Sequence, residues 1–347
     1  MPHPSTWLKP TPQGLCCEPG GFFIDPVRPV ERAVITHAHS DHARSGHRAV
    51  LASPVTIALM RARLGERAAA SWQDLRWGES LRIGEVELSL QPAGHVLGSA
   101  QVVLAWRGSR VVVGGDYKRA PDPTCDAFVP IPCDVFVTEA TFALPVFRHP
   151  PAAAEIGRLL ASVALFPGRT HLVGCYSLGK CQRMIALLRQ AGWDAPIYLH
   201  GALAPLCGVY EALGVRLGAL RPAATAPALA GAIVLAPPAA AAEAWAQRLA
   251  EPVLCMASGW MRLRRRAQQS GAELPLVISD HADWDELNAT VDEVGAPEVW
   301  VTHGREEALI HALGQRGVRG RALRLLGYDG EDEAGPKDGD ARPGADG

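Results

Sequence analysis

One short segment of the sequence concentrates residue types that bind metal ions. Residues 36–42 read THAHSDH, so three histidines and one aspartate occupy six consecutive positions directly after an apolar run at 33–36. Imidazoles and a carboxylate crowded this closely need a cation or many polar partners. Such nitrogen and oxygen donors suit Zn²⁺ or Mn²⁺. The segment therefore predicts a metal site in the loop that follows a strand.

Three single residues elsewhere in the chain also carry the carboxylate or imidazole groups that bind metal ions. Asp25 follows an apolar run, His95 stands after a glycine, and Asp116 follows a predicted strand at 110–114. Each is ordinary when taken alone, because a histidine beside a glycine is often only a turn residue.

Taken together and in this order, these residues resemble the motifs of the metallo-β-lactamase superfamily. Three later segments resemble motifs A, B and C of its β-CASP nuclease branch: 137–142 (VTEATF), 279–283 (SDHAD) and 301–304 (VTHG). The loops 115–119, 139–150 and 257–261 are similar to those of bacterial ligase-associated DNA exonucleases. The resemblance covers nearly the whole chain except its C-terminal tail.

The resemblance implies seven metal ligands in two sites, with two divalent metal ions, Zn²⁺ or Mn²⁺, as cofactors. The first site would hold its ion with His37, His39 and His95. The second would use Asp41, His42 and His303, and Asp116 would bridge the two. Asp25 would support the metal-binding loop from behind.

The same resemblance implies an acid–base pair beside the metals. The predicted catalytic residues are His281, Glu139 and Asp41. His281 would protonate the leaving oxygen, since imidazole titrates near neutral pH, and Glu139 would orient it. Two metals would activate water and clamp the phosphoryl group, and cleavage would leave a 5′-phosphate and a 3′-hydroxyl. The opposite assignment, with His281 as a ligand and His303 as the acid, stays open.

Three further places suit contacts with a substrate. Lys118 and Arg119 come shortly after Asp116. Ser177 and Lys180 open a predicted helix whose N-terminal amides could hold a phosphate, although an ordinary helix cap is an equal alternative. Trp260 and Arg262 precede three arginines at 264–266. A ring beside positive charge suits a single strand, and a solvated basic helix end is the alternative.

The rest of the chain predicts an α/β protein. Strands expected at 33–36, 85–90, 101–106, 110–114 and 134–138 dominate the first 140 residues, and strands alternate with helices from residue 151 onward. Helices are expected at 152–165, 239–249 and 284–294, and a final strand is expected at 322–326. With the resemblance, the expected fold is a metallo-β-lactamase αββα sandwich with an inserted parallel α/β β-CASP domain. The first domain would comprise 1–144 and 274–328, the insertion 145–273, and a disordered acidic tail 329–347.

Composition limits the class of protein. The chain has 347 residues, 48% of them hydrophobic and 20% charged, and no apolar run approaches the roughly 18 residues of a membrane span. Its formal net charge is −2, but the predicted tail has seven acidic and two basic residues and so carries −5, which leaves +3 on the remainder. The eight cysteines form no CxxC pair, which argues against a cysteine-built metal site or a disulfide framework. A cytoplasmic enzyme without a membrane segment is expected.

The expected function is that of a metal-dependent phosphodiesterase. Foremost is a DNA exonuclease of ligase-dependent DNA repair, acting on single-stranded DNA ends and associated with an ATP-dependent DNA ligase. An RNA-processing β-CASP nuclease is one alternative, because no residue that discriminates the 2′-hydroxyl is identifiable. A small-molecule hydrolase of the same fold is another, which motifs A, B and C disfavour. An inactive binding homologue is disfavoured because all the ligands are present.

Overall fold

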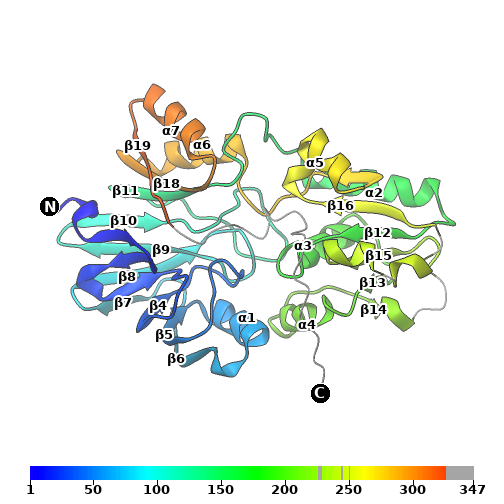
Figure 1. Cartoon of the computed structure of the whole chain (residues 1–347), viewed down its shortest axis with the longest axis horizontal. Coiled ribbons are helices and arrows are strands. Elements are labelled where there is room, and N and C mark those ends of the chain that lie inside the picture. Colours follow the sequence, from blue (N-terminus) through cyan, green and yellow to red (C-terminus); the bar gives the residue numbers. More distant parts are fainter. Residues whose placement is uncertain (226–228, 244, 250, 326–347) are drawn as a thin grey trace, which may run out of the picture.

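The strands of the protein form three sheets. The computed structural model describes residues 1–225, 229–243, 245–249 and 251–325, and the predicted acidic tail lies outside them. Within these residues the sheets have six, seven and six strands. Figure 1 shows the first two sheets with their helices in one half of the molecule and the third sheet in the other.

The first sheet carries the histidine-rich segment. Its strands follow one another in chain order: β1 (Leu8–Thr11), β2 (Gly14–Cys17), β3 (Phe22–Ile24), β4 (Arg32–Val34), β5 (His47–Ala52) and β6 (Ala69–Asp74). The pairs β3–β4, β4–β5 and β5–β6 are parallel, whereas β1–β2 and β2–β3 are antiparallel. The segment 36–42 begins two residues after β4, so the predicted position of this loop after a strand is confirmed.

The second sheet brings together distant parts of the sequence. Its order is β19 (Arg319–Ala322), β18 (Glu298–Gly304), β11 (Val135–Ala140), β10 (Ser109–Val113), β9 (Ala100–Trp106), β8 (Val86–Pro92) and β7 (Ser80–Ile83). Strand β18 returns after the third sheet and pairs in parallel with β11, placing Thr302 opposite Glu139. Strand β10 is also parallel to β11. The carboxyl ends of these three neighbouring strands therefore meet at one edge.

The first two sheets pack face to face, and helices cover both outer faces, so this half of the molecule has four layers. Apolar side chains of both sheets pack in a shared core, including Phe22 and Val34 from the first and Val102 and Trp300 from the second. Helices α6 (Trp284–Val294) and α7 (Glu306–Gln315) cover the outer face of the second sheet, where Leu287 packs with the strands. Helix α1 (Pro54–Leu64) covers the first. The predicted αββα arrangement is confirmed.

The third sheet is entirely parallel. Its order is β14 (Leu220–Pro222), β13 (Ile197–Leu199), β15 (Ile233–Ala236), β12 (His171–Gly174), β16 (Val253–Ala257) and β17 (Leu274–Leu276). Its helices are α2 (Ala152–Leu165), α3 (Lys180–Gln190), α4 (Ala204–Ala212) and α5 (Arg264–Gln269). One buried cluster joins Ile57 of α1 to Leu206 of α4, so this half packs directly on the first sheet's helix. The sheet ends at Leu276, three residues beyond the predicted end of the insertion.

Two expected elements differ from the structure. The helix expected at 239–249 is replaced by two short 3₁₀ turns, Pro238–Ala242 and Ala246–Arg248. This alanine-rich stretch has few large apolar side chains, and helices draw most of their stability from packing such a face. The last strand of the described residues is Arg319–Ala322, whereas a strand was expected at 322–326, of which residue 326 lies outside the described residues. No helix in the described residues is long and apolar enough to cross a membrane.

Candidate metal centre

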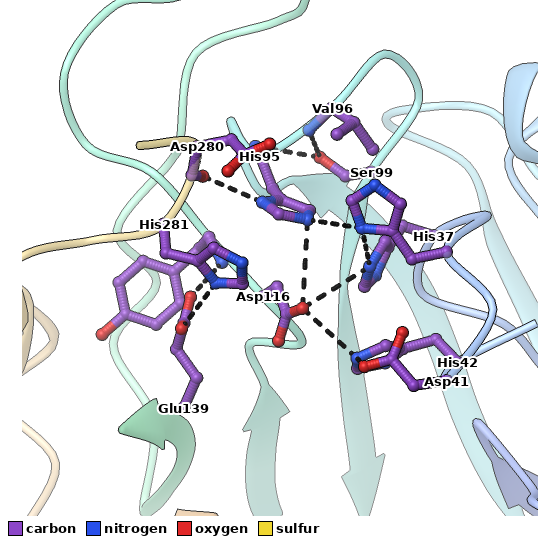
Figure 2. Close-up of polar contacts among 12 residues, drawn as sticks. His37, Asp41, His42, His95, Val96, Ser99, Asp116, Glu139, Asp280 and His281 are labelled. Carbon is purple, nitrogen blue, oxygen red and sulfur yellow. Dashed lines mark hydrogen bonds and ion pairs between the residues drawn. The ribbon is translucent and has the colours of Figure 1, made fainter. Parts of the chain in front are cut away.

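The ligands predicted for the first metal converge in space. His37, His39, His95 and Asp116 each offer a ligand atom, and these atoms lie within 4.8 Å of one another. His39 Nδ1 is 3.1 Å from His37 Nε2 and 3.0 Å from His95 Nε2. Figure 2 shows the imidazoles of His37 and His95 facing the Asp116 carboxylate. Facing ring nitrogens cannot all be satisfied by one another when the rings are neutral, so the group has the donor set of a cation site.

The second group shares Asp116 with the first. His42, Asp116 and His303 also bring their ligand atoms within 4.8 Å. Asp116 Oδ2 lies 3.3 Å from His42 Nε2, and its Oδ1 lies 3.7 Å from His303 Nδ1. Asp41 Oδ2 is 3.5 Å from His42 Nε2. Asp116 therefore belongs to both groups of ligand-type side chains.

Contacts behind the imidazoles decide which ring nitrogen faces the centre. His42 Nδ1 donates to Asp25 Oδ2 at 2.8 Å, which leaves Nε2 for the centre. Asp25 also accepts hydrogen bonds from the backbone N–H and the hydroxyl of Thr36. His95 Nδ1 donates to the Asp280 carbonyl at 2.8 Å. The supporting role expected of Asp25 thus has a geometric basis.

His39 is oriented by the other half of the molecule. Its Nε2 lies 3.2 Å from the carbonyl of Leu178, just before α3, so Nδ1 faces the centre. Gly179 adopts a φ of 82°, and a Cβ there would lie 2.3 Å from Val96 Cγ1. Only glycine allows this approach between the third sheet and the His95 loop.

Most of these groups have the protonation state that metal binding needs, whereas His42 holds a proton that a cation would displace. Burial lowers the pKa of His95 to about 3 and that of His303 to about 4, and burial with the neighbouring histidines lowers the pKa of His37. Neutral imidazole is the form that binds metal. Burial opposes the ionisation of Asp116, but His42, His281 and His37 together hold the Asp116 pKa well below its ordinary range. Asp116 and Asp41 in turn outweigh burial and raise the pKa of His42.

A buried acid–base pair adjoins the centre. His281 Nδ1 lies 2.8 Å from Glu139 Oε2, and both side chains are buried. The other Glu139 oxygen accepts the Tyr117 N–H at 2.8 Å. Burial raises the pKa of Glu139 against the attraction of His281. His281 also comes within 4.8 Å of Asp116 and Glu139 as a third ligand-type group, so proximity allows it either of the two predicted roles.

Lys118 and Arg119, which were predicted to contact a substrate, are paired with carboxylates of the protein itself. Lys118 is buried, and its Nζ donates to Glu286 at 2.7 Å. Arg119 donates to both oxygens of Glu293 at 2.8 Å. Contact of these groups with a substrate stays a prediction.

At the start of α3, where a phosphate site was predicted, the lysine is buried and paired with a carboxylate. Lys180 is fully buried, and its Nζ lies 2.5 Å from Asp280 Oδ1 and 3.3 Å from the Ile278 carbonyl. Ser177 is half-buried. The Lys180 ammonium neutralises Asp280 in this structure, and its contact with a phosphate stays a prediction.

Asp280 was not anticipated as a site residue. It lies between two predicted motif residues, yet its partner Lys180 is 100 positions away, so no local pattern signals the pair. Trp260 is half-buried against Phe142, with ring centroids 5.0 Å apart, and Arg262 is exposed. His149, from the loop 139–150, packs edge-on against Phe142 with ring centroids 4.7 Å apart.

Comparisons with known proteins place these observations among relatives. Residues 24–168 match the sequence model of a family described as the Metallo-beta-lactamase superfamily. A protein named as a probable DNA ligase in Opitutus terrae is 29% identical over 339 residues, which cover 95% of this chain and 32% of that protein. A ribonuclease of Thermus thermophilus is 30% identical over 212 residues, which cover 53% of this chain and 49% of the relative. The chain thus spans about a third and about half of these relatives.

A solved structure supports the fold. A crystal structure of a protein of unknown function from Enterococcus faecalis superposes with a TM-score of 0.52 at 13% identity. The match covers 86% of this chain and 80% of that one. At this identity the likeness concerns the fold alone.

Proposed function

Because this chain is a relative of the metallo-β-lactamase and β-CASP nucleases, we propose that it is a two-metal-dependent nuclease that hydrolyses phosphodiester bonds. The observation that supports this most is the shared position of Asp116 between two groups of histidines, with His281 and Glu139 beside them. His37, His39 and His95 would hold one cation, and Asp41, His42 and His303 the other. These nitrogen and oxygen donors fit Zn²⁺ or Mn²⁺.

The protein groups have separate tasks in this mechanism. When bound, two divalent cations would polarise the phosphoryl group and favour attack by water in line with the leaving oxygen. Glu139 accepts the hydrogen bond of His281 Nδ1, which leaves Nε2 to deliver a proton to that oxygen. The carboxylate also favours the protonated imidazole by its charge. The predicted products are a 5′-phosphate and a 3′-hydroxyl.

We further propose that the substrate is DNA and the mode exonucleolytic. The match to the protein named as a probable DNA ligase covers 95% of this chain, which supports action beside a DNA ligase in repair. The ribonuclease of Thermus thermophilus supports RNA as the second candidate. The cytoplasmic location stays a prediction.

Digestion of end-labelled strands separates these substrates. Single-stranded DNA and RNA of one sequence, each with a 5′-phosphate or a 5′-hydroxyl, are incubated with the protein and Mn²⁺ or Zn²⁺. We expect progressive shortening of DNA, starting from the 5′ end. Preferential digestion of RNA would replace the DNA proposal with the RNA candidate, and digestion of neither would contradict the nuclease proposal.

A further inference from the structure

A line of rings leads from the acid–base pair to the surface of the third sheet. The His281 and Phe142 ring centroids are 6.1 Å apart, and Phe142 lies 5.0 Å from Trp260. The Arg266 guanidinium then stacks over Trp260 at 5.5 Å. Phe142 is fully buried, whereas Trp260 is half-buried. The predicted proton donor is therefore linked by two ring contacts to a partly open aromatic face.

A cluster of positive charge continues from this face. Arg262, Arg264, Arg265 and Arg266 occupy the 3₁₀ turn Gly259–Arg262 and the first residues of α5 (Arg264–Gln269), and all four are exposed. Among the described residues none of them lies against a carboxylate. Nearby Arg148 and Arg169, by contrast, pair with Asp285 and Glu273. Four adjacent cations without counter-charge repel one another unless an anion lies close by.

Two side chains in the same place hold polar atoms that nothing in the described structure satisfies. Both ring nitrogens of His149 and Nε1 of Trp260 are buried without a hydrogen-bond partner. His149 Cε1 would lie 3.1 Å from a Cβ at Gly259, so these two segments are in direct contact. Buried polar atoms usually have partners, and orphaned ones mark places where a ligand or water completes the site.

We propose that Trp260, His149 and the arginines at 262, 264, 265 and 266 form a track that binds a single-stranded nucleic acid as it leaves the metal centre. Trp260 would stack a base, and the arginines would contact successive phosphates. His149 and Trp260 Nε1 would donate hydrogen bonds to the strand beside His281. The proposal rests on the proposed function insofar as the strand is the substrate.

The features of the track favour a flexible strand over a small substrate. Arg266 lies over Trp260, which is two ring contacts away from His281, so a molecule that fills only the metal centre would not reach it. Single-stranded DNA and RNA share the phosphates and base faces that the track would recognise.

Binding is measurable separately from hydrolysis. The variant R262Q/R264Q/R265Q/R266Q removes four charges and keeps good helix formers. Its matched control, R28Q/R67Q/R76Q/R82Q, removes four exposed arginines of the first 90 residues. Affinity for fluorescein-labelled single-stranded DNA and RNA is measured in EDTA over a range of salt, and hydrolysis of bis(4-nitrophenyl) phosphate is measured with metal.

We expect the track variant to bind both strands at least about tenfold more weakly. The slope of its binding constant against salt, on logarithmic scales, should be shallower by roughly 0.7 for each phosphate that an arginine no longer neutralises. The control variant should keep the strand affinity, the salt slope and the hydrolysis of the small diester within about twofold of the parent protein. Equal weakening in both variants, or unchanged affinity in the track variant, would overturn the proposal. If the parent protein binds strands but hydrolyses neither the strands nor the small diester, the proposed function is contradicted and the proposed binding track is not.

Trp260 gives a second test that does not depend on charge. Trp260→Phe keeps a ring and Trp260→Leu removes it, while circular dichroism checks that both remain folded. Loss of one stacked base is expected to weaken strand binding by roughly tenfold in the leucine variant and much less in the phenylalanine variant. Equal affinity of the two variants would remove Trp260 from the track.

Discussion

The Asp116 carboxylate lies within hydrogen-bond or ion-pair reach of several imidazoles at once. Its oxygens are 3.3 Å from His42, 3.6 Å from His37 and 3.7 Å from His303. Without a metal, protonation of His42 supplies the opposing charge, because the pKa of His42 is raised by Asp116 and Asp41 against the effect of burial. Two divalent cations would replace that proton with a stronger and better-distributed positive charge.

His281 provides the sharpest test of the assigned roles. In His281→Ala the leaving oxygen loses its proton donor, so we expect turnover to fall roughly 10²- to 10⁴-fold. The metal content should stay at the parent level because the proposed ligands are intact. Steady-state kinetics and elemental analysis of the same preparation measure both quantities.

The control is His303→Ala, which should lose metal as well as activity. If His281→Ala instead loses one metal equivalent and His303→Ala retains both, the two histidines exchange roles.

At the scale of elements, helix α3 of the third sheet supports the metal centre of the first two. The segment before α3 provides the Leu178 carbonyl to His39, and Lys180 pairs with Asp280, whose own carbonyl orients His95. Lys180 draws the pKa of Asp280 far below its ordinary value, although burial acts in the opposite direction. The half that contains the third sheet thus helps to orient two of the proposed metal ligands, His39 and His95.

Removal of the Lys180 charge tests this connection. Lys180→Met leaves the buried Asp280 carboxylate without its partner, which should lower the free energy of unfolding by about 3–5 kcal/mol. Urea unfolding of metal-free protein measures the change. Metal affinity should fall as well, since the Asp280 carbonyl holds His95.

Two further variants separate charge from shape. Lys9→Met breaks an exposed pair with Glu18 and should cost no more than about 1 kcal/mol. Combining Lys180→Met with Asp280→Asn removes both buried charges and should recover much of the lost stability. A Lys180→Met protein as stable as the Lys9→Met protein would contradict the supporting role.

The elements themselves were predictable where their local pattern is strong. The predicted helices 152–165 and 284–294 coincide with α2 and α6, since both have regular apolar spacing, and Asp283 caps α6. Helix α1 was not anticipated, because its apolar residues are not confined to one face. The short strands β1 to β3 are only three or four residues long. Strand β1 contains Pro10, and β2 contains the adjacent free cysteines Cys16 and Cys17. Such segments take their conformation from neighbouring strands.

The site residues were predictable where they form a local motif, and their distant partners were not. Residues 36–42 carry their signal within seven positions, and the structure brings them to Asp116 and His303. The internal pairing of Lys118, Arg119 and Lys180 was not predictable, because each partner is more than 90 positions away in the chain. Charge in a sequence does not reveal whether solvent, substrate or a distant carboxylate will receive it.

For the whole molecule, the buried histidines couple stability to pH. In metal-free protein the pKa of His95 is about 3 and that of His303 about 4, whereas both are near 6.5 in an unfolded chain. Below pH 6.5 the unfolded chain therefore binds protons that the folded protein does not. Their contribution to stability is present above this pH and is lost as the pH falls toward 4.

We expect the free energy of unfolding of EDTA-treated protein to decrease by a few kcal/mol, on the order of 2–5, between pH 7.5 and pH 4.5. The raised pKa of His42 acts in the opposite direction, and its stabilisation is lost as the pH rises above 6.5. Urea titrations at several pH values measure the balance. Constant or increasing stability on acidification would show that these imidazoles are not buried in the neutral form.

The central claim is that Asp116 joins two metal sites, and metal stoichiometry tests it most directly. Purified protein is loaded with Zn²⁺ or Mn²⁺, freed of excess metal and analysed for metal per chain, together with an Asp116→Ala variant. We predict close to two metal ions per chain in the parent protein and a clear loss in the variant, accompanied by loss of phosphodiester hydrolysis. A parent protein without bound metal, or an Asp116→Ala variant that keeps both ions and full activity, would contradict the account.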